Sequence, residues 1–159
     1  LGVDFLPGSF GFDGGVPEGD TDAGRILWLD AFCANVDRSW RNPNMLVWHR
    51  KLWIIDHGAS LYFHHAWAGG VTDPQRFAAQ PWDAGDHVLL DHVADLPAAD
   101  REITAMLTPA VLHDVLEQVP DEWLEPVPGA ETPQALREAY VAFLLARLSP
   151  RQWLPNGGA

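Results

Sequence analysis

Two short apolar runs separated by a polar tip constrain the fold of this chain most. Met45-Leu46-Val47-Trp48 and Leu52-Trp53-Ile54-Ile55 are rich in aliphatic and aromatic residues, and His49-Arg50-Lys51 separates them. This pattern predicts a β-hairpin with a tight turn. Two strands of four or five residues bring positions about 12 apart to the same end of the ladder. We therefore expect the residue before the first strand and the residue after the second to lie side by side.

Polar residues suited to phosphoryl transfer flank this hairpin. Asp37 lies in a polar turn that also contains Asn42 and Asn44, and Asp56-His57-Gly58 follows the second strand. Phosphoryl transfer needs one carboxylate to orient the attacking hydroxyl, and an amide oxygen and a second carboxylate to hold Mg²⁺ against the nucleotide phosphates. The glycine permits unusual backbone angles after the second carboxylate. The pattern thus predicts a magnesium-nucleotide site at the base of the hairpin.

The order Asp, Asn, strand, turn, strand, Asp-x-Gly resembles the catalytic loop and metal-binding segment of protein kinases. The stretch NVDRSWRNPNMLVWHRKLWIIDHGASLYFHHAW is most similar to the bacterial HipA-like kinase domain family, and the similarity continues through DHVLLDHV, VPDEWL and REAYVAFLLARL. The resemblance implies an α+β, mainly α fold: a protein-kinase-like C-terminal lobe with a catalytic-loop β-hairpin and a helical bundle. This lobe is expected over residues 1–154, with a loop or interlobe segment at 1–20 and a disordered tail at 155–159.

The resemblance also assigns roles to the polar residues. Asp37 is the catalytic aspartate that accepts or orients the proton of the acceptor hydroxyl. Asp56 binds Mg²⁺ and, with Gly58, contributes to nucleotide binding. Asn42 and Asn44 compete for the remaining metal position: Asn42 follows Asp37 by five residues, as in most kinases, whereas Asn44 directly precedes the strand. Strand register fixes where a side chain points, which favours Asn44, and Asn42 stays open.

The implied co-substrate is ATP with Mg²⁺, and the acceptor is a hydroxyl of a protein Ser/Thr or of a small molecule. A kinase also needs a lysine that engages the nucleotide phosphates. The only lysine of the chain, Lys51, lies at the predicted hairpin tip. We therefore expect an ATP-anchoring N-terminal lobe upstream of Leu1, and we expect this chain alone to be inactive or nearly so.

Charge and composition exclude several other classes of protein. The net charge of −12 argues against nucleic acid and anionic membranes as partners. No apolar run approaches the roughly 20 residues needed to span a bilayer. A single cysteine, Cys33, rules out an intrachain disulfide and fits a cytoplasmic protein. Cys33 lies in an apolar helical stretch, where we expect a buried and inert thiol.

Two alternatives to a kinase remain open. His57, His64 and His65 lie near Asp56 in sequence and could ligate the metal of a hydrolase, although no H-E-x-x-H spacing is present. Eight tryptophans could also leave apolar surface for a partner. The chain would then be a pseudokinase or a protein-interaction module.

Apolar spacing and capping residues predict the remaining elements. Residues 1–20 are expected as loop and residues 59–82 as irregular. Helices are expected from Thr21 or Asp22 to about Val36, over 86–93, over 98–107, from Pro109 to about Gln118, and from Pro133, capped by Thr132, to Leu148.

Overall fold

The predicted hairpin is present and gains a third strand. The computed structural model, which describes residues 5–19, 21–149 and 151–155, pairs β2 (Met45–Trp48) antiparallel with β3 (Lys51–Ile54). His49 and Arg50 form the two-residue turn, and their φ angles of 48° and 61° match the mirror-image turn that suits twisted hairpins. Lys51 thus belongs to the strand, opposite Trp48, rather than to the tip.

The third strand lies in a segment predicted to be loop. β1 (Phe10–Gly11) pairs antiparallel with β2, so the sheet order is β1-β2-β3. The prediction of loop over residues 1–20 is therefore wrong at these two residues, because the open edge of β2 supplies backbone partners that local sequence does not reveal. Residues 1–4 and 20 lie outside the described residues, as do residues 156–159 of the predicted disordered tail.

Helices make up most of the regular secondary structure in the described residues, so the fold is α+β and mainly helical. Three helices have a side-chain cap and a proline in the first turn: Asp95, Thr108 and Thr132 each accept a backbone N–H of that turn. The helices at Pro109 and Pro133 begin as predicted, whereas the helix predicted over 98–107 begins at Leu96. The helices are α1 (Ala23–Cys33), α2 (Pro74–Ala78), α3 (Leu96–Met106), α4 (Pro109–Glu117) and α5 (Pro133–Leu148), and short 3₁₀ helices span Tyr62–Gly69, Leu90–His92 and Asp121–Trp123.

The first helix ends earlier than predicted. Ala34 adopts a left-handed conformation with φ 54°, and the N–H of Asn35 then donates to the backbone oxygen of Asp30. Val36, placed on the buried face by its spacing, is 66% exposed. The early end turns the chain toward Asp37.

Two other segments also differ from the prediction. Residues 59–82, predicted to be irregular, contain the 3₁₀ helix Tyr62–Gly69 and α2. Residues 86–93, predicted to be helical, contain only the 3₁₀ helix Leu90–His92. His87 and Val88 instead contact the turn before β2, where the N–H of Val88 donates to the backbone oxygen of Arg38. These tertiary contacts outweigh local helix preference.

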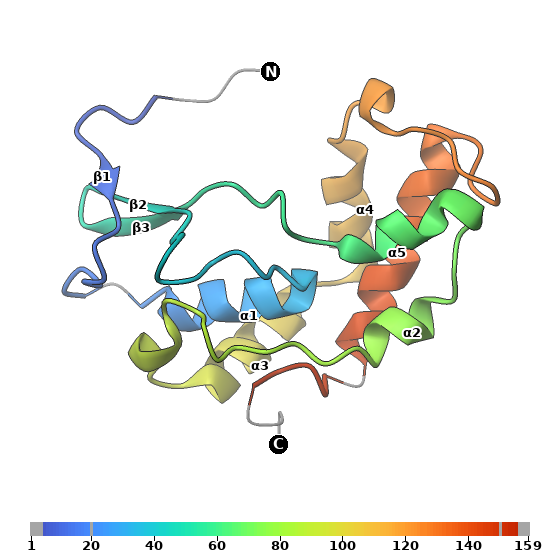
Figure 1. Cartoon of the computed structure of the whole chain (residues 1–159). Helices are drawn as coiled ribbons and strands as arrows, with labels where there is room; N and C mark the ends of the chain where they lie inside the picture. The colour runs from blue at the N-terminus through green and yellow to red at the C-terminus, as the bar shows by residue number, and fades with distance from the viewer. Residues whose placement is uncertain (1–4, 20, 150, 156–159) are drawn as a thin grey trace.

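α1 connects the two halves of the molecule (Figure 1). Its first turns pack with the sheet in one apolar cluster that includes Ile26, Met45 and Val47. Its later turns join the helical half through a second cluster that includes Trp28 and Phe32. A third, aromatic cluster around Phe143 joins α2 and α5. Within the described residues, no helix combines the length and apolarity needed to cross a bilayer.

Candidate functional site

The three polar residues predicted to lie before the hairpin form one cluster. Nδ2 of Asn42 donates to Oδ2 of Asp37 over 2.8 Å. Nδ2 of Asn44 donates to the backbone oxygen of Asp37 over 2.8 Å and to its Oδ2 over 3.3 Å. Both asparagines therefore use their amide nitrogens toward Asp37, and no described residue hydrogen-bonds their Oδ1 atoms. Each Oδ1 thus remains available as a ligand of a hard cation.

Asp56 lies at the base of the hairpin, beside Asn44. The N–H of Ile55 donates to the backbone oxygen of Asn44 over 2.9 Å, so the residues that flank the two strands are adjacent. Asn44 and Asp56 both have positive φ angles, of 47° and 50°. Among the described residues, no hydrogen bond joins Asp56 to Asp37 or to either asparagine. The hairpin brings the two segments together, and the Asp56 side chain is solvent-exposed.

Gly58 does not supply the unusual backbone angle that its position predicted. The unusual backbone angle lies at Asp56, and Gly58 itself does not have a left-handed φ. The N–H of Gly58 donates to Oδ1 of Asp56 over 3.2 Å, and a Cβ at Gly58 would lie 3.2 Å from the same oxygen. That distance is short for a carbon–oxygen contact, so glycine leaves room for the carboxylate. A Cβ at this position would require the Asp56 carboxylate to shift by a few tenths of an ångström, so the advantage of glycine is steric rather than conformational.

Lys51 lies at the opposite end of the hairpin from these residues. It is exposed, and it pairs with Trp48 next to the turn, whereas Asn44 and Asp56 flank the base. The length of the hairpin therefore separates Lys51 from Asn44 and Asp56.

A buried ion pair that the sequence pattern did not predict supports the Asp37 turn. Arg38 is 2% exposed and Asp30, on α1, is 1% exposed. Nε of Arg38 donates to Oδ2 of Asp30 over 2.5 Å, and Nη2 donates to Oδ1 over 3.3 Å. Burial by itself raises the pKa of Asp30. Hydrogen bonds from His87, Arg38 and Asn35 and the charge of Arg38 outweigh this effect, and the pKa is lowered.

Two further side chains complete the surroundings of Asp30. Nε2 of His87 lies 3.0 Å from Oδ2 of Asp30, while Nδ1 accepts the N–H of Leu89, which places the ring proton on Nε2. Nδ2 of Asn35 donates to Oδ1 of Asp30, and Oδ1 of Asn35 accepts the N–H of Asp37. One feature of the sequence was a signal for this network. Asp30 lies four positions after Ile26, so a charged residue shares a face of α1 with a buried apolar residue.

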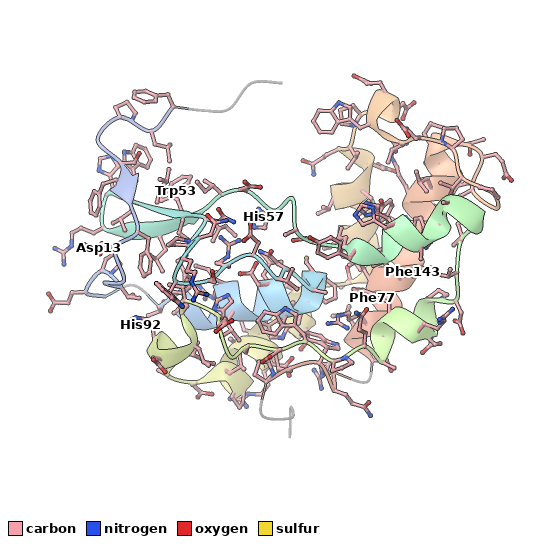
Figure 2. All side chains as sticks on the ribbon, in the orientation of Figure 1. Asp13, Trp53, His57, Phe77, His92 and Phe143 are labelled. Atoms are coloured by element: carbon pink, nitrogen blue, oxygen red, sulfur yellow. The ribbon has the colours of Figure 1, made fainter. Side chains whose placement is uncertain are left out.

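His57 is the contact between this network and the segment that follows β3 (Figure 2). Nη2 of Arg38 lies 3.2 Å from Nε2 of His57. Since a guanidinium only donates, Nε2 accepts and the ring proton is on Nδ1. Burial, followed by the positive charge of Arg38, lowers the pKa of His57. The ring is therefore neutral at pH 7, and its other edge faces solvent.

The histidines do not form a metal centre with Asp56. His64 and His65 are neighbours on the 3₁₀ helix Tyr62–Gly69, and their ring centroids are 4.1 Å apart. In the described part of the chain, no group of three His, Cys, Asp or Glu side chains is placed to hold a metal ion.

The thiol of Cys33 belongs to the packing between α1 and its neighbours. It contacts the apolar cluster around Trp28 and Phe32, and burial raises its pKa to about 12. Such a thiol is almost entirely protonated at neutral pH, which agrees with the expected inert residue.

Comparison of the chain with models of protein families, with curated proteins and with solved structures gave no match in any of the three.

Proposed function

We propose that this chain is the catalytic lobe of an ATP- and Mg²⁺-dependent phosphotransferase of the HipA-like Ser/Thr kinase type. The observation that carries the proposal is the convergence of the Asn42 and Asn44 amides on Asp37, at the end of the hairpin where Asp56 follows β3. This arrangement supplies the carboxylates and amide oxygens that phosphoryl transfer requires.

The donor set suits Mg²⁺, which prefers carboxylate and carbonyl oxygens. Asn44 and Asp56 are the proposed ligands. Asn44 is half-buried and its side chain makes two hydrogen bonds, whereas Asn42 is exposed and makes one. The better fixed amide is the more precise ligand, so we assign Asn42 to orienting Asp37. When bound, the metal would neutralise charge on the nucleotide phosphates.

Asp37 has the role of orienting the acceptor hydroxyl and accepting its proton. Its Oδ2 atom already accepts two amide donors, so the other carboxylate oxygen, Oδ1, is the atom proposed to face the acceptor. The acceptor is a hydroxyl of a protein Ser/Thr or of a small molecule. Since Lys51 is the only lysine and lies at the far end of the hairpin, we expect this chain alone to bind metal and nucleotide but to transfer phosphate very slowly.

Metal binding by the purified chain tests the proposal. Mn²⁺ replaces Mg²⁺ as a paramagnetic probe, and NMR line broadening is recorded with and without ATP. We expect broadening to concentrate on residues 37–44 and 55–58. Asp56→Asn should weaken Mn²⁺ binding roughly tenfold or more, as typical for loss of a carboxylate at a metal site. Asp91→Asn, an exposed aspartate on Leu90–His92, is the matched control.

Broadening outside these segments, or unchanged in Asp56→Asn, would refute the proposed metal site. The interaction-module alternative has one observation in its favour: Trp40 and Trp123 are 63% and 59% exposed. A wild-type chain that binds neither Mn²⁺ nor ATP would favour that alternative.

A further inference from the structure

Arg38 contacts three separate segments that meet at the candidate site. Besides Asp30 on α1, its Nη1 atom donates to the backbone oxygen of Asn44 over 2.5 Å and lies 3.4 Å from that of Pro43. Its Nη2 atom donates to His57, which directly follows Asp56. One buried guanidinium therefore bonds to the residue before β2 and to the segment after β3.

These contacts lie beside two residues with an unusual backbone conformation. Asn44 and Asp56 both have left-handed backbone angles, which persist only when the surroundings determine them. The backbone oxygen of Asn44 accepts from both Arg38 and Ile55, while its side chain donates to Asp37. Arg38 thus contributes to the position of Asn44 without touching its amide oxygen.

Asp30 and His87 hold Arg38 in turn. Both carboxylate oxygens of Asp30 accept from the guanidinium, and His87 donates to one of them. The N–H of Val88 also donates to the backbone oxygen of Arg38 over 3.1 Å. Contacts with α1 on one side and with residues 87–88 on another therefore fix Arg38, so its guanidinium group is held in one orientation.

We propose that Arg38, held by Asp30 and His87, is a positioning residue that sets the separation of Asn44 and Asp56 and thereby the affinity for the metal. This inference rests on the proposed function, since it concerns the same two ligands. Lysine cannot replace arginine here, because one ammonium cannot reach Asp30, Asn44 and His57 with the geometry of a planar fork.

The experiment compares Mn²⁺ affinity in Arg38→Lys with that in Arg147→Lys. Arg147 is an equally buried arginine on α5 whose hydrogen bonds go to backbone oxygens of α1 and near the end of α2 and do not reach the hairpin, so it controls for lost stability. Affinity is read from NMR broadening at a temperature where circular dichroism shows each variant to be folded. We expect Arg38→Lys to bind Mn²⁺ roughly tenfold more weakly, and Arg147→Lys to bind it as the wild type does.

A gentler variant covers the case in which Arg38→Lys does not fold. His87→Leu removes one hydrogen bond to Asp30 and the acceptor of the Leu89 N–H but leaves Arg38 in place, so we expect roughly fivefold weaker Mn²⁺ binding. If Arg38→Lys folds and binds Mn²⁺ with wild-type affinity, the positioning role is overturned. If only His87→Leu folds, wild-type affinity in that variant has the same meaning. In both cases the proposed function stands. Equal weakening in Arg38→Lys and Arg147→Lys would also overturn the positioning role, since lost stability would then suffice. Absence of Mn²⁺ binding in the wild type would remove the proposed function and this inference together.

Discussion

Arg38 and Arg147 are both almost completely buried, at 2% and 0% exposure, but they are stabilised in different ways. Arg38, beside the sheet, pairs with the carboxylate of Asp30. Arg147, in the helical half, has only backbone oxygens as hydrogen-bond acceptors. The comparison shows two ways to stabilise a buried cation: an ion pair with a carboxylate, or hydrogen bonds to backbone oxygens at the ends of helices.

Arg147 connects three helices. From α5 it donates to the backbone oxygens of Ala31 and Phe32 at the end of α1, and to those of Phe77 and Gln80 at the end of α2. Helix C-termini carry partial negative charge that favours a cation. The guanidinium carbon also lies 4.5 Å from the centroid of the Phe77 ring, which is labelled in Figure 2. Burial lowers the pKa of Arg147 to about 10, because no carboxylate offsets the desolvation.

The difference between their contacts indicates that Arg38 and Arg147 have different roles. The contacts of Arg147 join helices and do not reach the hairpin, so we expect it to contribute stability alone. The contacts of Arg38 converge on the hairpin base, so we expect it to contribute both stability and site geometry. Variants at the two positions can break or sharpen this distinction.

The largest effect is expected for Arg147→Met. Three buried carbonyls and one partly buried carbonyl would lose their donor at once, which corresponds to about 4 kcal/mol of the free energy of unfolding. Urea denaturation followed by tryptophan fluorescence measures this loss. Arg76→Met, at an exposed arginine of α2, is the control and should change stability by less than about 0.5 kcal/mol. An Arg147→Met chain as stable as the control would show that the carbonyls find other partners.

Asp30→Asn should have the next largest effect, since it leaves the guanidinium of Arg38 buried without an opposite charge. We expect a loss of about 3 kcal/mol by urea denaturation. The double variant Asp30→Asn/Arg38→Met removes both charges, so its loss should be clearly smaller than the sum of the two single losses. Strict additivity would mean that the two side chains do not interact energetically.

A smaller effect is expected in the dependence of stability on pH. The folded state lowers the pKa of Asp30 below its ordinary value of 3.8, so the unfolded chain takes up the proton more readily. The stabilisation from this ionised carboxylate is complete above about pH 4 and is lost as the pH falls through the folded-state pKa. Thermal denaturation between pH 5 and 2.5 should show a steeper decline in the wild type than in Asp30→Asn. Parallel declines would contradict the lowered pKa.

The smallest effect is expected for Lys51→Ala, which removes a basic residue that is exposed. Stability should change by less than about 0.5 kcal/mol, and Mn²⁺ affinity should be unchanged because Lys51 lies at the far end of the hairpin. The same NMR titration measures the Mn²⁺ affinity of the wild type and of the variant. Markedly weaker Mn²⁺ binding in Lys51→Ala would mean that the metal lies elsewhere on the hairpin.

Local signals predicted a large part of the fold. The hairpin follows from two apolar runs around a polar tip, and α5 begins and ends where Thr132, Pro133 and Leu148 predicted. The adjacency of Asn44 and the segment of Asp56 follows from the hairpin alone. In each case the determining interactions lie within a few residues of one another, so the sequence by itself contains the information.

Only the tertiary structure decided which charges are buried and what holds the candidate site. Asp30 and His87 meet across 57 positions of sequence, and Arg147 reaches Ala31 across 116. Other long-range contacts place residues 86–93 against the turn before β2 and pair β1 with β2, and no local pattern predicted either of them. No local pattern encodes such pairings, because a buried charge depends on which distant segment supplies its partner. The sequence therefore determined the hairpin and the residues at its base, and packing decided how firmly they are held.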